Sequence, residues 1–143
     1  MRRLLGSCLA LTALLAMAAA PVAAGTRTAV SITATTVFDD VADGFVATGI
    51  PGCAAGTVSD GGAHLEFTLS QGIFAGDKVF DCGGDNGFVL RLNARFDPDG
   101  SVGTWSVLDA WGAAAGMSGA GKLTGTPIEG DGITDVYVGI VTR

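Results

Sequence analysis

The stretch Phe88-Val89-Leu90-Arg91-Leu92-Asn93-Ala94-Arg95-Phe96 decides the fold class of this chain of 143 residues. Every second side chain, beginning with Phe88, is apolar, and three of the four side chains between them are polar or charged. Successive side chains of a β-strand point to opposite faces of a sheet. The alternation therefore predicts a strand with one face against a core and the other in water.

Similar alternation recurs on both sides of this strand, whereas helical periodicity is hard to find after residue 25. We expect further strands over residues 28–38, 64–69, 78–82, 102–108, 122–126 and 133–141. Turn sequences separate them: Asn86-Gly87 favours a tight hairpin with positive φ at both positions, Asp97-Pro98-Asp99-Gly100 suits a type I turn, and Glu129-Gly130-Asp131-Gly132 interrupts the chain again. About eight short strands predict an all-β domain, a closed barrel or a sandwich.

Glycine is unusually abundant, with 23 residues in the whole chain. Because aromatic and β-branched residues alternate with the glycines, disorder is not expected. Glycine inside strands marks bulges, sharp bends and close backbone approach, which a small barrel needs in order to close. The segment from Gly112 to Gly125 is the strongest candidate for such a bend.

The N-terminus has the features of a cleavable signal peptide. Arg2 and Arg3 give a positive start, Leu4–Ala20 carries no charge, and small residues around Ala24 suit a cleavage site. A membrane anchor is the weaker alternative, because the apolar run is short for a membrane span. We therefore expect a secreted protein with no stable membrane anchor, in which residues 1–24 are removed and residues 25–143 form one domain.

Charge limits the partners of the mature domain. The chain has 8 basic and 14 acidic residues, and loss of Arg2 and Arg3 makes the mature domain more acidic still, with a net charge of about −8. Nucleic acid and anionic membranes are not expected as partners, because both need a basic patch and the remaining cations are scattered. The sequence indicates no particular oligomeric state.

Two cysteines remain after processing, because Cys8 is discarded with the signal peptide. In an oxidising compartment Cys53 and Cys82 are expected to form a disulfide. A metal site would need more ligands than these two cysteines and the lone His64 offer, so we expect no metal and no cofactor.

Three motifs resemble catalytic or binding sequences, and each is incomplete. Gly116–Lys122 matches most of a phosphate-binding loop, but Leu123 stands where a Ser or Thr should ligate magnesium, and no helix is predicted after it. His64 and Glu66 form the best acid/base pair, yet their alternation with Leu65 indicates that they face solvent. A calcium site of unusual shape, formed by Glu129, Asp131 and Asp135, remains an alternative.

Aromatic and apolar side chains supply the other candidate site. Ligand sites are mostly apolar with a few placed polar groups. We therefore predict ligand contacts for side chains that could equally fill the core, namely Phe67, Phe88, Leu90, Trp105 and Tyr137.

The chain also resembles an uncharacterised family of small exported bacterial proteins related to the allene oxide cyclase and dirigent barrels. The resemblance covers roughly residues 45–141 and rests on the two cysteines and on the blocks 103–107, 112–125 and 135–139. It implies an eight-stranded, antiparallel, calycin-like barrel. The residues Ala110, Trp111 and Ala114 depart from the pattern, and no catalytic residue of the cyclases can be matched, so cyclase activity is not carried over.

These observations favour a secreted barrel that binds a small apolar or amphipathic molecule, or a protein partner, rather than an enzyme. An isomerase or cyclase that uses the shape of the barrel is one alternative. A structural protein of the cell envelope without a ligand is the other.

Overall fold

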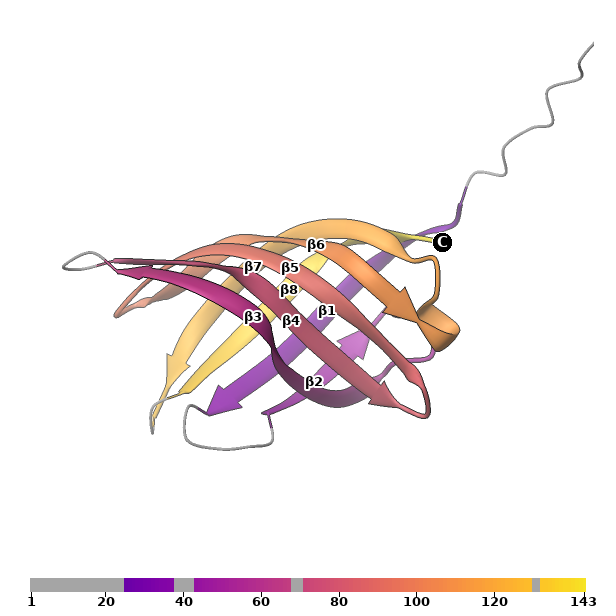
Figure 1. Ribbon diagram of the computed structural model, residues 1–143, viewed down its shortest axis with the longest axis horizontal. Coiled ribbons are helices and arrows are strands. Elements are labelled where there is room, and N and C mark those ends of the chain that lie inside the picture. The colour runs from indigo at the N-terminus through magenta and orange to yellow at the C-terminus, as the bar shows by residue number, and fades with distance from the viewer. Residues whose placement is uncertain (1–24, 38–42, 68–70, 130–131) are drawn as a thin grey trace, which may run out of the picture.

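The protein is an all-β barrel closed by eight antiparallel strands (Figure 1). The computed structural model describes residues 25–37, 43–67, 71–129 and 132–143, without the side chains of residues 63–67. Each strand pairs with the next along the chain, and the last pairs with the first. The elements are β1 (Arg27–Val37), β2 (Asp43–Thr48), β3 (Ala55–Phe67), β4 (Gly72–Gly83), β5 (Asn86–Asp97), β6 (Gly100–Trp111), a 3₁₀ turn η1 (Gly112–Ala114), β7 (Ser118–Ile128) and β8 (Gly132–Thr142).

This architecture confirms the predicted fold class, including the barrel in place of a sandwich. The strand quoted at the outset lies within β5, and its apolar set faces the interior. The proposed signal peptide, residues 1–24, lies outside the described residues. Among the residues that are described, no helix has the length and apolarity to cross a bilayer.

The hairpin predicted at Asn86-Gly87 is wrong by two residues. Gly83 pairs with Asn86, so the two loop residues are Gly84 and Asp85, with φ of 58° and 61°. Positive φ at both positions is the geometry that a two-residue hairpin needs. Asn86 has a different role, because its side-chain amide donates to the carbonyl oxygens of Gly83 and Gly84 at 3.3 and 3.1 Å.

The other two predicted turns are placed correctly. Asp97 pairs with Gly100, and the Asp99 amide donates to Asp97 Oδ1 at 2.9 Å, as in a turn stabilised by an aspartate side chain. Ile128 and Gly132 are paired on either side of the third break.

An aromatic cluster fills the part of the interior next to the turn between β4 and β5. We call it the aromatic floor, and it consists of Phe45, Phe80, Phe88 and the ring of Tyr137. Phe80 and Phe88 are stacked with their ring centroids 4.7 Å apart, and Phe45 and Tyr137 meet Phe80 edge-on at 5.0 and 5.7 Å. Ring pairs of these kinds add about 0.5–1.5 kcal/mol each to the gain from burial. The floor is therefore packed rather than open.

Glycines face large aromatic rings on neighbouring strands. Trp105 lies over Gly121 and Gly139, and a Cβ on either glycine would come within 2.7 Å of the indole. The indole nitrogen then donates to the Lys122 carbonyl oxygen at 3.1 Å. Two further pairs of register partners repeat this arrangement: Phe96 over Gly72 and Trp111 over Gly87. Part of the glycine excess thus makes room for rings.

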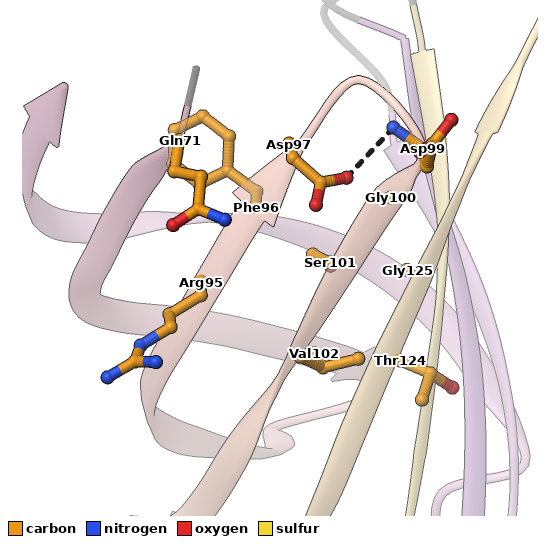
Figure 2. Close-up of a pocket in the computed structure, with 10 residues that line it drawn as sticks. All are labelled: Gln71, Arg95, Phe96, Asp97, Asp99, Gly100, Ser101, Val102, Thr124 and Gly125. Atoms are coloured by element: carbon orange, nitrogen blue, oxygen red, sulfur yellow. Dashed lines mark hydrogen bonds between the residues drawn. The ribbon is translucent and has the colours of Figure 1, made fainter. Parts of the chain in front are cut away.

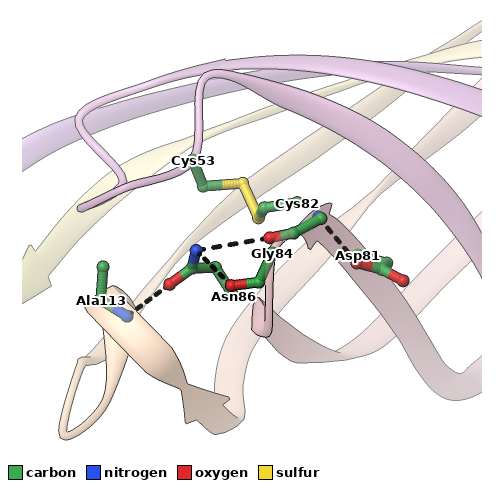
Figure 3. The surroundings of a disulfide bond; sticks show 7 residues. Cys53, Asp81, Cys82, Gly84, Asn86 and Ala113 are labelled. Atoms are coloured by element: carbon green, nitrogen blue, oxygen red, sulfur yellow. Dashed lines mark hydrogen bonds between the residues drawn. A yellow bond between two sulfur atoms is a disulfide. The ribbon is translucent and has the colours of Figure 1, made fainter.

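The disulfide joins the loop after β2 to the last residues of β4 (Figure 3). Cys53 follows β2 and is bonded to Cys82 near the end of β4, with their Cα atoms 5.3 Å apart, which confirms the predicted pairing. Beside it, Asn86 Oδ1 accepts a hydrogen bond from the Ala113 amide of η1 at 2.6 Å. This region is the expected bend after Gly112, although the regular strand β7 already begins at Ser118. The disulfide and the side chain of Asn86 together fix the connections between β2 and β3, between β4 and β5, and between β6 and β7.

Loss of the disulfide should destabilise the barrel. The bond spans 29 residues of sequence, for which loop-closure entropy gives roughly 3–4 kcal/mol. The double variant Cys53→Ser/Cys82→Ser should therefore melt on the order of 10 °C lower than the oxidised protein. Circular dichroism melts of the variant and of the reduced wild type should agree, and unchanged melting in both would contradict this role.

The fit of the Phe96 ring against Gly72 gives a second expected outcome. Gly72→Ala places a methyl group where the Phe96 ring lies and should destabilise the domain by roughly 1–3 kcal/mol in urea denaturation. Gly44→Ala is the matched control on a strand, because its Cβ would meet nothing closer than 3.9 Å. Equal stability of the two variants would show that the glycine is not required by the ring.

Candidate functional site

Four polar groups lie next to the aromatic floor, three of them inside the barrel and one, Asp60, at its rim, and we call them the polar belt: Asp60, Lys78, Asp135 and the hydroxyl of Tyr137. Lys78 alternates on β4 with Phe80, and Asp135 alternates on β8 with Tyr137, so both follow the inward face of their strands. Asp60 of β3 is the register partner of Lys78. Three strands therefore bring acidic, basic and hydroxyl groups to one level of the barrel.

Asp135 is the most enclosed carboxyl group of the belt, with 9 % of the residue exposed. Burial raises the pKa of Asp135, while the positive charge of Lys78 and a hydrogen bond from Tyr137 oppose this rise. Its Oδ1 and the Ser101 hydroxyl lie beside Gly125, where a Cβ would come within 2.5 and 2.2 Å of them. The absence of a side chain at Gly125 leaves the space that the carboxyl group occupies.

Tyr137 joins the belt to the floor. Its ring packs edge-on against Phe80, and its hydroxyl donates to Asp135 Oδ2 at 3.5 Å. Burial, followed by the negative charge of Asp135, raises the pKa of the Tyr137 phenol. The hydroxyl therefore stays protonated and acts as a hydrogen-bond donor at neutral pH.

Lys78 connects the belt to solvent. Its side chain is 12 % exposed, and its Nζ lies 2.6 Å from Asp60 Oδ1 and 6.0 Å from the centroid of the Phe74 ring. Asp60 is 65 % exposed, because β2 has only six residues and its pairing with β3 ends at Val58. Within the described residues, no strand covers β3 on that side beyond Val58. The belt is thus buried at Asp135 and accessible at Asp60.

Apolar side chains also lie on the far side of the belt from the floor. Along β4 and β5 the inward positions beyond Lys78 and Leu90 are Phe74, Leu92, Ala94 and Phe96, which we call the apolar collar. The interior therefore has three layers: a packed aromatic floor, a polar belt and an apolar collar. Such a sequence of layers can hold an apolar body and fix the orientation of one polar group.

The residues predicted to contact a ligand fall into two groups. Phe88, Leu90, Trp105 and Tyr137 are brought together in the core, where each is at most 2 % exposed. The side chain of Phe67 lies outside the described part, as do those of His64 and Glu66, so their roles stay predictions. Of these residues, Tyr137 alone belongs to the polar belt.

Sequence reasoning missed Lys78, Asp60 and the role of Asp135 in the belt. One signal was available: Lys78 stands two residues before Phe80, at an inward position of an alternating strand. Asp135 similarly stands two residues before Tyr137. A charged residue within the apolar set of a strand could have identified both.

Two surface hollows lie away from the floor and the belt, and the first includes Phe96 of the collar in its wall. The first surrounds the turn between β5 and β6, and Figure 2 shows Asp97 and Asp99 on that turn. It reaches Ser101 and Gly125, the residues that flank Asp135 from β6 and β7. The second lies over the outer side of β7 and β8, with Lys122, Val138 and Ile140 in its wall. Neither contains Phe88, Leu90, Trp105 or Tyr137.

The remaining motifs can now be placed. Gly116–Lys122 runs from a turn into β7, so a strand rather than a helix follows its glycines. Glu129 is exposed at the end of β7, Asp135 is inside the barrel, and Asp131 lies outside the described residues. Within the part of the chain that is described, no three His, Cys, Asp or Glu residues gather as metal ligands.

Comparisons with known proteins leave the relationships of the chain open. No protein-family model matches it, and no match is found among curated proteins or solved structures. The resemblance to the allene oxide cyclase and dirigent families therefore stays a prediction, whereas the eight-stranded barrel itself is established by the strand pairing.

The environment of Asp135 predicts a pH dependence of stability. A carboxyl group whose pKa is higher in the folded than in the unfolded state, where 3.8 is ordinary, binds its proton more tightly when folded. Its contribution therefore decreases as pH rises from about 4 through the raised pKa. Asp135→Asn removes the titrating carboxyl group and its pH-dependent contribution. The free energy of unfolding of the wild type should therefore fall relative to that of the variant as the pH rises over that range.

Urea denaturation at a series of pH values measures this difference. Asp99→Asn, at an exposed position of the turn between β5 and β6, is the matched control and should give a parallel curve to the wild type. A constant difference between the wild type and Asp135→Asn from pH 4 to neutrality would contradict the buried environment of the carboxyl group.

Proposed function

We propose that this protein binds a small, mostly apolar molecule inside the barrel, with a polar group of that molecule against the polar belt. The observation that carries the proposal is the position of Lys78, Asp135 and the Tyr137 hydroxyl between two apolar layers. Burying charged groups costs free energy, and a barrel needed only as a scaffold would be more stable with apolar side chains there. A bound ligand with a polar group would explain why these polar side chains are present in the interior.

The apolar collar supports an apolar body for the ligand. The floor is packed, so a ligand has to lie on the side of the belt where Phe74 is only partly buried. Small residues on that side, including Ala94 and Gly76, occupy inward positions next to Phe74. Contact with the collar would remove apolar surface of the ligand from water, which favours binding by about 25 cal/mol for each Å² buried.

Export supports an extracellular role within the same proposal. The disulfide between Cys53 and Cys82 is compatible with an oxidising compartment, and the N-terminal sequence has the features of a signal peptide. The protein would therefore meet its ligand outside the cytosol.

An isomerase or cyclase is the second candidate, and one arrangement favours it. Asp135, whose pKa is raised by burial, lies beside the protonated hydroxyl of Tyr137. A carboxyl group and a phenol in an apolar site can exchange a proton with a bound molecule. The predicted resemblance to the allene oxide cyclases points in the same direction, toward rearrangement of an unstable epoxide.

Titration of the mature protein with a library of lipids and small apolar metabolites tests the binding function. Ligands should raise the melting temperature of the wild type, because they bind only the folded state. Ala94→Leu fills the collar and should weaken binding tenfold or more, whereas Asn93→Leu, which faces solvent on the same strand, should leave it unchanged. Melting of each unliganded variant checks that it is folded.

The wild type and the variants also distinguish ligand binding from the cyclase and from the structural protein of the cell envelope. Faster turnover of an unstable allylic epoxide than in buffer, abolished in Asp135→Asn, would assign the cyclase function instead. A flat response to every compound, with no turnover, would refute both and leave the structural envelope protein. Equal effects of Ala94→Leu and Asn93→Leu would place the ligand outside the barrel.

A further inference from the structure

We propose that the interior site selects a neutral amphipathic molecule whose polar group is a hydrogen-bond-accepting oxygen, such as an alcohol, ketone or ester, over carboxylates and amines. This inference rests on the binding function proposed above and specifies the chemistry of the ligand. It follows from the number and sign of the charges that the polar belt brings together.

Lys78 provides the donor for such an oxygen. An ammonium group has three N–H bonds. Among the described residues its ion-pair partner is Asp60, at 2.6 Å. An oxygen from the ligand can share the ammonium group without breaking that pair. The Tyr137 hydroxyl donates its single hydrogen to Asp135 Oδ2 at 3.5 Å, so within the belt Lys78 is the donor for the ligand oxygen.

The acidic members of the belt oppose an anionic ligand. Asp60 already neutralises Lys78, and Asp135 is a second carboxyl group close enough for Lys78 to act on it electrostatically. A ligand carboxylate would therefore face two carboxyl groups and only one ammonium group. It would also lose its hydration beside an aromatic floor, where a charged group is costly to bury.

A cationic ligand meets the opposite difficulty. Lys78 is directed into the interior with only 12 % of its side chain exposed, so an amine entering the collar would approach a like charge. The Phe74 ring, 6.0 Å from Lys78 Nζ, already has a cation near it. A neutral oxygen can accept a hydrogen bond from Lys78 without bringing a second unpaired charge into the interior.

Isothermal titration with decanol, decanoate and decylammonium, which share one chain length, tests the inference at neutral pH and below micellar concentrations. Decanol should bind the wild type at least tenfold more tightly than the other two. Asp60→Asn leaves Lys78 without its counter-charge, so the affinity for decanoate relative to decanol should rise tenfold or more.

Asp77→Asn is the matched control on β4. Asp77 forms an ion pair with Arg91 on the outer face, where Arg91 Nε and Nη2 donate to its two carboxylate oxygens at 3.0 and 3.2 Å. Its removal should leave the decanoate-to-decanol ratio unchanged. Lys78→Met, which removes the donor itself, should weaken decanol binding while the collar remains, and melting curves report the folding of each variant.

The outcomes distinguish this inference from the function on which it rests. Tighter binding of decanoate or decylammonium than decanol to the wild type, or an unchanged ratio in Asp60→Asn, would overturn the selection for a neutral oxygen and leave ligand binding intact. Binding of none of the three probes to the folded wild type would refute the proposed function, and this inference with it.

Discussion

The closed ring of eight antiparallel strands is the constraint on which the rest of the structure depends. A barrel of eight strands has an interior just wide enough for side chains to fill or for one small ligand, so each inward position must match the width available at its level. A large ring at one position requires glycine at its register partner on the next strand, as Phe96 does with Gly72. The glycine content is therefore a consequence of packing in a narrow barrel, in addition to the curvature that closure imposes.

Because the interior is narrow, the presence of polar side chains in the belt needs an explanation. Space inside the barrel is limited, and burying Asp135, Lys78 and the Tyr137 hydroxyl uses part of it for groups that water solvates better. The stability of the domain rests instead on the aromatic floor, on the continuous strand pairing and on the disulfide between Cys53 and Cys82. A fold stabilised in these ways can retain an unfavourable interior cluster, and the proposed ligand site would explain why this cluster is present.

Where alternation is regular, the sequence alone predicts the strands. Residues 88–96 predict β5 to within two residues of its observed bounds, because one face is buried and the other is solvated. β2 was missed because Val46, on its outward face, is apolar and 59 % exposed, which hides the alternation in Phe45-Val46-Ala47. Most of β3 was also missed, because Asp60, Gly61 and Gly62 resemble a turn but form a bulge within the strand.

The candidate site was harder to predict for a related reason. The pairing of Asp60 with Lys78 depends on the register of β3 against β4, and that register shifts at the bulge between Asp60 and Gly62. The spacing of residues along the sequence does not reveal this shift in register. Prediction of the disulfide, by contrast, needed only the count of cysteines outside the predicted signal peptide, and prediction of the core aromatics needed only the alternation along their strands.

The central claim, that a ligand lies inside the barrel between the belt and the collar, is tested most directly by nuclear Overhauser effects between decanol and the isotope-labelled protein. The account predicts contacts from the ligand chain to the Phe74 ring and the Ala94 methyl group, and from the carbon next to its hydroxyl to Lys78. Contacts confined to the outer face, at Val138 and Ile140, would contradict it.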